Sequence, residues 1–353
     1  MAAASNLLAI VLVALLAVAL WAAVRRAITG TGVGARPGHV SAPAPTPVRR
    51  ALRAEAAAAS AGLAAGLGAA AIVCLVGGWW PQGYGLPYAL AGSIGAVAGL
   101  LVHTLLPRPS WPASGDGRVV AELSPRGPTS FARQWVFVLP LASSCVLVLG
   151  MLLAGLASAT DENGLHRVFQ RRGLSGWGVE DGGVVDVQYG VSSSGPFPGW
   201  YYGVPVLVGT ILLVAVVYWS LRRVAHAPRP ASADLFPGDT VLRSVRTQFV
   251  MAASSSALAF QIAGLSAITG SVLLGSYLDS VPTADLDAVP GTVPVEPGHT
   301  LALVLLLSAV AVAVAALVLL AKSIAIVADL WTAASERGER VEPVGPVEHR
   351  STR

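Results

Sequence analysis

QWVFVLPLASSCVLVLGMLLAGLASAT, residues 134–160, contains no Asp, Glu, Lys or Arg. A helix rises about 1.5 Å per residue, so about 20 apolar residues cross a hydrocarbon core about 30 Å thick. This stretch exceeds that length, and so does a second charge-free window at 247–278. Both windows are too long for ordinary core helices and predict transmembrane helices.

Seven segments meet the same criterion of length and apolar composition. They are 5–24, 56–78, 86–106, 135–158, 203–221, 248–277 and 300–321. The composition agrees, because charged residues make up 12% of the chain whereas soluble domains carry about 25%. The sequence therefore predicts an all-α integral membrane protein with about seven transmembrane helices.

The basic residues divide unequally between alternate loops. Twenty of the 23 basic residues lie in four segments, which are 25–55, 107–134, 221–247 and the tail from residue 322. Loops rich in Arg and Lys stay in the cytoplasm. Segment 5–24 lacks a basic start and is followed by Arg25-Arg26, so it is expected to be an uncleaved anchor rather than a signal peptide. We expect a multi-pass plasma membrane protein with its N-terminus outside and its C-terminus in the cytoplasm.

Three segments share one order of features: a basic start, a helix out, an outward loop and a helix back. The start RQWVFVLPLASSC at Arg133 is similar to RTQFVMAASSS at Arg246, and Tyr84-Gly85-Leu86-Pro87 recurs as Tyr202-Gly203-Val204-Pro205. These similarities predict three parallel hairpin repeats after the anchor. The predicted parts are an N-terminal anchor at 1–30, a linker at 31–50, hairpin 1 at 51–106, a linker at 107–132, hairpin 2 at 133–221 with an outward loop at 159–201, a linker at 222–245, hairpin 3 at 246–321 and a cytoplasmic tail at 322–353.

The repeated Tyr-Gly-apolar-Pro stretches are expected to begin helices at the membrane surface. Proline suits the first turn of a helix, and Trp and Tyr rings prefer the headgroup level. The residues assigned to these interfacial helix entries are Trp79, Trp80, Tyr84, Pro87, Trp200, Tyr202 and Pro205. The alternative is a binding vestibule lined by the same tryptophans together with Tyr201 and Tyr202.

The outward loop 159–201 is predicted to form a small β or loop lid. Thr160-Asp161 is expected to cap a short helix through HRVFQRR, residues 166–172, and the alternation over 185–191 is typical of a strand. A turn at 181–183 would fold that strand back onto 176–179. The third outward loop, 279–298, is expected to be extended.

Polar residues inside the spans are few. Gln261 lies in the middle of the sixth segment with Ser255 and Ser256 beside it, and His103 lies near the end of the third. The simpler interpretation of Gln261 and the serines is hydrogen bonding between helices. For His103 it is solvation at the inner surface. A polar pathway through these four residues, with His103 in a proton relay, is the alternative. The GxxxG pairs Gly62 with Gly66 and Gly95 with Gly99 are interpreted as helix-packing sites.

Motifs for catalysis are absent from the sequence. It contains no Walker, GxGxxG, HExxH, GxSxG or CxxC pattern at a usable position, so we expect no enzyme, no catalytic residue and no cofactor. Asp161, Glu162 and His166 do not have the spacing of a metal site. The arginines are spread over juxtamembrane loops, which indicates orientation and anionic lipid rather than nucleic acid as partner.

The Pro-Arg-Pro linkers at 107–109 and 228–230, the Ala-Ser-Ser helices and GPFPGWYYG at 195–203 carry a resemblance. The chain resembles a family of multi-pass membrane proteins of streptomycetes and related actinobacteria that has no assigned activity. Members are often encoded beside a small regulator and an ABC-type ATPase. The resemblance implies a transport-associated membrane subunit.

Three functional hypotheses follow. The first is a non-enzymatic membrane partner of a separate ATPase, which would grip a coupling segment at 231–246 or 112–126. The second is a stand-alone small-molecule transporter or channel with a polar cavity around Gln261. The third is a membrane sensor or enzyme that uses the loop 159–201.

Overall fold

The computed structural model describes residues 45–109, 111, 127–180, 183–281 and 291–335, and segment 5–24 therefore lies outside the described residues. The helices are α2 (Thr46–Trp79), α3 (Leu86–Leu105), α4 (Gln134–Ala157), α5 (Trp200–His226), α6 (Phe236–Ser276) and α7 (Gly298–Ser335), with short 3-10 helices η2 (Pro81–Gly83) and η3 (Ala233–Leu235). The strands are β1 (Ala159–Thr160), β2 (His166–Glu180), β3 (Gly183–Ser194), β4 (Leu278–Val281) and β5 (Gly291–Pro294). The described chain is thus mostly helical.

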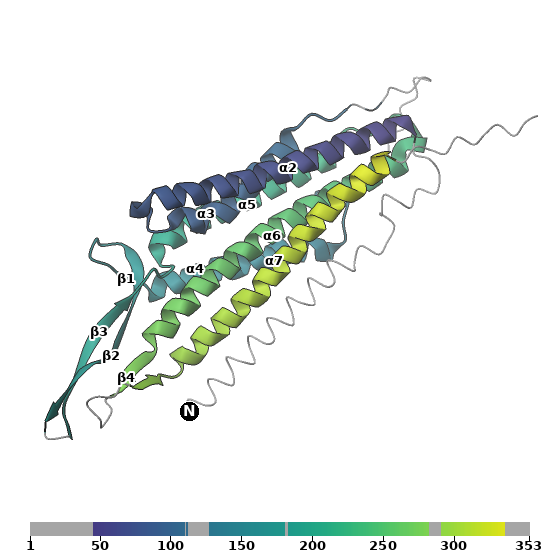
Figure 1. The fold of residues 1–353 in the computed structure, drawn as a ribbon. Coiled ribbons are helices and arrows are strands. Elements are labelled where there is room, and N and C mark those ends of the chain that lie inside the picture. Colours follow the sequence, from purple (N-terminus) through teal and green to yellow (C-terminus); the bar gives the residue numbers. More distant parts are fainter. Residues whose placement is uncertain (1–44, 110, 112–126, 181–182, 282–290, 336–353) are drawn as a thin grey trace, which may run out of the picture.

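The long helices run side by side, and the strands lie at one end of the bundle (Figure 1). Helix α2 packs along α3, and α6 packs along α7. Helix α5 contacts α3, α4 and α6, and the α2–α3 and α6–α7 pairs also contact each other directly, through α2 with α7 and α3 with α6. Each pair turns back at the end that carries the strands, which we call the outer end. The three pairs correspond to the three predicted hairpins, and whether the pairs arose from one repeated unit stays a prediction.

Helix α6 occupies the centre of the bundle. It contacts α2, α3, α4, α5 and α7, and more of its apolar stretch is buried than in any other described helix. A helix enclosed on most sides has no broad face for lipid and can carry small polar residues. Ser254, Ser255 and Ser256 are accordingly buried. Helix α7 lies at the edge and exposes Leu307 and Val310.

All six helices are long and apolar enough to cross a membrane. Their outer faces expose large apolar side chains, including Leu141, Leu156, Ile211 and Leu307. Apolar surface of this extent is unfavourable in water and is satisfied by hydrocarbon, and helices meet their own backbone hydrogen-bonding needs there. The described helices are consistent with a multi-pass membrane protein.

Helices α2, α6 and α7 continue furthest past the limits expected from the sequence. Helix α2 begins at Thr46 rather than near residue 51, α6 begins at Phe236 rather than near 246, and α7 ends at Ser335 rather than near 321. The added turns carry charged residues, so they lack the signal of a span. The helical hydrogen bonds nevertheless continue through them, because charged residues such as Arg and Glu are good helix formers.

The three extensions pack together at the end of the bundle opposite the strands. Leu52 of α2, Leu242 of α6 and Leu330 of α7 belong to one buried apolar cluster there. We call residues 46–55, 236–247 and 322–335 the inner projection. Because it has a core of its own, the inner projection is a packed body rather than a set of frayed helix ends.

The outer loops contain two small antiparallel sheets. Strands β2 and β3 form a hairpin in which Trp177 pairs with Val187 and Gly178 pairs with Asp186, as predicted for that part of the loop. The helix predicted through 166–172 is wrong, because these residues belong to β2. Their partner strand supplies a ladder of hydrogen bonds, with Phe169 opposite Ser194. The third outer loop is extended at both described ends, where β4 pairs with β5.

Candidate functional site

Four titratable side chains meet where the inner projection joins the spans. Glu55 of α2 is at the centre and is only 1% exposed. Its Oε1 lies 2.9 Å from Nε2 of His103 on α3. Its Oε2 accepts hydrogen bonds from Nε of Arg108, at 3.3 Å, and from Nε of Arg246 on α6. We call these four residues the Glu55 cluster, which links α2, α3 and α6.

Small neighbours allow the helices to approach Glu55 this closely. Four alanines, residues 56–59, follow Glu55, and Gly62 lies two turns further along the same face of α2. A Cβ on Gly62 would lie 2.8 Å from the Cβ of His103 and 2.9 Å from the carbonyl oxygen of Gly99. Glycine at position 62 is therefore what leaves room for the imidazole beside α2.

His103 is buried, whereas the sequence suggested that it would be solvated at the inner surface. The side chain is 3% exposed and its ring lies against Phe249 of α6, with ring centroids 4.8 Å apart. Glu55, in the added turns of α2, and Phe249 of α6 cover it. Its Nδ1 finds no hydrogen-bond partner among the described residues.

The Glu55 cluster is electrically asymmetric. It contains one carboxylate and two guanidiniums, so it carries an excess of positive charge with His103 neutral. The carboxylate side chain is 1% exposed, while the side chains of Arg108 and Arg246 are 19% and 16% exposed. Burial lowers the pKa of Arg108, Glu55 acts in the opposite direction and Arg246 lowers it further. Arginine remains charged at neutral pH regardless, so the positive groups are the accessible part of the cluster.

A second ionic group stabilises the inner projection. The guanidinium of Arg243, on α6, donates to Oδ2 of Asp239 at 2.8 Å and is itself almost fully buried. It also donates to the carbonyl oxygens of Val224, at 2.7 Å, and Ala227, at 2.8 Å. These carbonyls end α5 and have no partner within that helix. Arg243 therefore caps α5 and fixes its end against α6.

Gln261 connects α6 to α3. Its Oε1 accepts a hydrogen bond from the hydroxyl of Ser93 at 2.8 Å, and its Nε2 donates to the carbonyl oxygen of Ala89 at 2.9 Å. Ser256 donates to the carbonyl oxygen of Ala316 on α7 at 2.9 Å. These contacts are the helix-to-helix bonds expected from the simpler interpretation. Ser255 is buried, and His103 belongs to the Glu55 cluster, so a pathway through all four residues stays a prediction.

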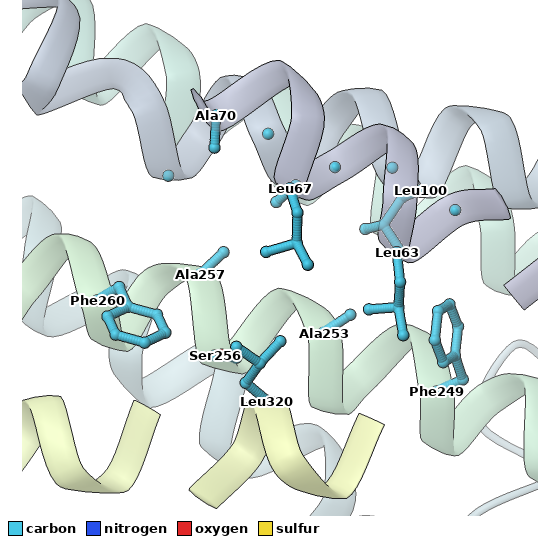
Figure 2. A pocket seen from close by; sticks show the side chains of 16 residues that line it. Leu63, Leu67, Ala70, Leu100, Phe249, Ala253, Ser256, Ala257, Phe260 and Leu320 are labelled. Carbon is cyan, nitrogen blue, oxygen red and sulfur yellow. The ribbon is translucent and has the colours of Figure 1, made fainter. Parts of the chain in front are cut away.

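A cavity of about 270 Å³ lies between the α2–α3 pair and the α6–α7 pair (Figure 2). Leu63 and Leu67 of α2 project into it from one side, and Ala253 and Ala257 of α6 face them (Figure 2). Ser256 is the one residue with a polar side chain in the lining. The lining is therefore almost entirely apolar, and the polar cavity around Gln261 that the transporter hypothesis expects stays a prediction.

The two repeated helix entries meet in space. The hydroxyl of Tyr202 donates to the carbonyl oxygen of Tyr84, and that of Tyr201 donates to the carbonyl oxygen of Gly83 at 3.2 Å. Tyr84 and Gly85 both have positive φ, of 48° and 85°, which makes the sharp turn that glycine favours before α3. The described contacts join the outer ends of α3 and α5.

The other entry residues differ in their environment. Pro87 lies in the first turn of α3, as predicted, whereas Pro205 lies inside α5, because that helix already begins at Trp200. Trp79 is 84% exposed and Trp80 is also exposed. Tyr202 is buried and bonded, so the rings do not all face one vestibule.

Asp161 has a local structural role. Its carboxylate accepts hydrogen bonds from the backbone N–H groups of Asn163, at 2.9 Å, and Leu165, at 2.8 Å, and from the guanidinium of Arg167. Desolvation tends to raise the pKa of Asp161, but these hydrogen bonds outweigh it and hold that pKa below its usual value. Among the described residues, no three His, Cys, Asp or Glu side chains form a group able to hold a metal ion.

Glu55, Arg108 and Arg246 are the site residues that the sequence did not reveal. Each lies at a charged boundary of an apolar segment, so hydropathy assigns all three to the loops. The available signal was the helical spacing of Glu55, Gly62 and Gly66, which places the carboxylate on the same face as the GxxxG pair.

A scan against protein-family models found no match, and searches among curated proteins and solved structures found no match either.

Proposed function

We propose that the chain is a non-enzymatic plasma membrane protein with seven transmembrane helices, of which segment 5–24 is the first. Its N-terminus is outside and its C-terminus is in the cytoplasm, after three related hairpins. The distribution of basic residues supports this orientation, since twenty of 23 lie in the four segments of the sequence that alternate with the outward loops. The β2–β3 hairpin then forms a small outer lid.

Within this frame the protein is the membrane subunit of a transport assembly that is driven by a separate cytoplasmic ATPase. The observation that carries this proposal is the continuity of α6, whose 41 residues run without a break from the inner projection into the apolar bundle. Such a helix is about 60 Å long, roughly twice the thickness of the hydrocarbon core. A displacement of the inner projection by the ATPase would therefore be transmitted to the spans through a rigid helix.

The predicted coupling segment 231–246 lies at the tip of the inner projection. It forms η3 and the first turns of α6, and its Leu235 and Leu242 are buried in the projection core. The opposite side of the segment exposes Asp234 and Thr240. One face thus anchors the segment, and the other is available to a partner. The second predicted segment, 112–126, lies outside the described residues.

Co-purification from native membranes tests the ATPase partnership. The full chain with an affinity tag is purified from its own cells in mild detergent, and ATP hydrolysis in the eluate is measured. We expect ATPase activity to accompany the wild-type chain and most of it to be lost from Asp234→Arg, because the tip then presents the opposite charge.

Glu162→Arg is the matched control, since it makes the same charge change in an exposed residue of the outer loop. It should retain the ATPase activity of the wild-type chain. Absence of ATPase from the wild-type eluate, or equal retention by Asp234→Arg and Glu162→Arg, would contradict the proposal.

A further inference from the structure

The cavity lies in a wedge between two helix pairs. Helices α2 and α7 meet in the inner projection, where Leu52 and Leu330 share a core. The two ribbons move apart toward the outer end (Figure 1). On the α6 side of the wedge, Ala253 and Ala257 are too short to fill the space that opens (Figure 2). The wedge is therefore a groove with an unfilled apolar volume.

The groove opens sideways from the bundle. Leu67 and Phe260 line the cavity and are 54% and 38% exposed. Both residues lie within the apolar segments 56–78 and 248–277, so the medium at the mouth is hydrocarbon rather than water. A void in contact with acyl chains gains dispersion contacts when one of those chains enters it.

Positive charge lies beside the inner end of the groove. Phe249 lines the cavity and packs on His103. Arg246 is one helical turn before Phe249, and Glu55 is about 10 Å along α2 from Gly62. The excess guanidinium of the Glu55 cluster is thus next to the apolar volume. Arg108 and Arg246 retain access to solvent, whereas the carboxylate between them is enclosed.

We propose that an anionic phospholipid of the surrounding bilayer occupies this groove. One acyl chain lies in the cavity, and the phosphate lies beside Arg108 and Arg246. Guanidinium groups bind phosphate oxygens through charge-assisted hydrogen bonds, and basic pockets between spans on the cytoplasmic side suit anionic headgroups. A bilayer lipid fits better than a soluble anion, because the apolar volume is reached from within the hydrocarbon.

Native mass spectrometry of the purified full chain tests this site. The protein is exchanged in detergent with phosphatidylglycerol or with phosphatidylcholine of the same acyl chains, and the retained lipid is counted. We expect wild type to retain phosphatidylglycerol in preference. Arg108→Gln should reduce that retention about fivefold, the effect of one arginine near an anionic surface. Ala253→Phe should also reduce it, by filling the cavity while leaving every charge in place.

Arg222→Gln is the matched control for charge, since Arg222 is exposed on α5, a helix that does not line the cavity. It should retain phosphatidylglycerol as wild type does. The melting temperature of each variant is measured, and Ala257→Leu replaces Ala253→Phe if the latter unfolds. Equal retention of the two lipids by wild type, displacement by inorganic phosphate alone, or no difference between the groove variants and Arg222→Gln would overturn the proposal.

The test is independent of the ATPase partnership. Lipid retention is measured on the chain alone, whereas co-purification is measured at the tip of the inner projection. Either result can fail while the other holds.

Discussion

Glu55 is the single anionic group that holds two guanidiniums and an imidazole from neighbouring elements. Removing it leaves Arg108 and Arg246 with no shared counter-charge in a largely enclosed site. Loss of one partner from a buried ion pair costs about 3–5 kcal/mol. Because both arginines keep some contact with solvent, we expect Glu55→Ala to cost about 3 kcal/mol, at the low end of that range.

Thermal unfolding of the protein in detergent measures this effect as a lower Tm. Glu162→Ala removes a carboxylate that is exposed in the outer loop and should leave the Tm unchanged. If both variants melted at the wild-type temperature, Glu55 would have no stabilising role.

His103 and Glu55 show what hydropathy alone does not predict. Hydropathy places His103 near the end of a span. It contains no information on which other helices extend past that end. Burial of His103 depends on Glu55, in the extra turns of α2, and on Phe249 of α6. The role of Glu55 depends on Arg246, which lies 191 residues away in the chain.

At the scale of elements, the GxxxG pairs join α2 to α3 through close backbone contact. A Cβ on Gly99 would lie 2.6 Å from the carbonyl oxygen of Gly62, and a Cβ on Gly95 would lie 2.7 Å from that of Gly66. The packing interpretation of these glycines is therefore confirmed. We expect Gly99→Ala to destabilise the protein by about 1–3 kcal/mol, because the helices must move apart.

Gly150 of α4 provides the matched control for this substitution. A Cβ there would meet nothing within 4 Å, and Ala favours a helix over Gly. Gly150→Ala should therefore be neutral or slightly stabilising in the same thermal unfolding experiment. A Tm for Gly99→Ala at or above that of Gly150→Ala would show that α2 and α3 tolerate a wider spacing.

The elements predicted from the sequence are those that the membrane dictates. Six of the seven apolar segments correspond to described helices, because span length and apolar composition follow from bilayer thickness. Hydropathy did not locate the ends of α2, α6 and α7, since those turns lie outside the apolar region. Residues 166–172 form a strand because their pairing with β3 outweighs the local preference for a helix.

At the scale of the whole molecule, orientation gives a further prediction. The described helices that are long and apolar enough to cross a membrane number six. If all six cross, the start of α2 and the end of α7 lie on the same side. Segment 5–24, if it crosses, puts residue 1 on the opposite side from residue 353. We expect a fluorescent reporter that folds only in the cytoplasm to be bright when fused after Arg353.

A truncation after Asn163 carrying the same reporter is the control, because that residue lies in the outer loop between α4 and α5. It should be dark, and a phosphatase that works only outside the cell should be active there instead. A dark fusion at Arg353 would show that the bundle has the opposite orientation.

The inner projection and the β2–β3 hairpin lie at opposite ends of the bundle (Figure 1). A particle embedded in a lipid nanodisc would therefore show density on both faces of the disc. The inner projection would give a thick helical feature on one face, and the β2–β3 hairpin would give a thin feature on the other. Electron micrographs of such particles can be aligned on these two unequal features. The 36.0 kDa protein would therefore have an asymmetric outline by which its two ends can be distinguished in such images.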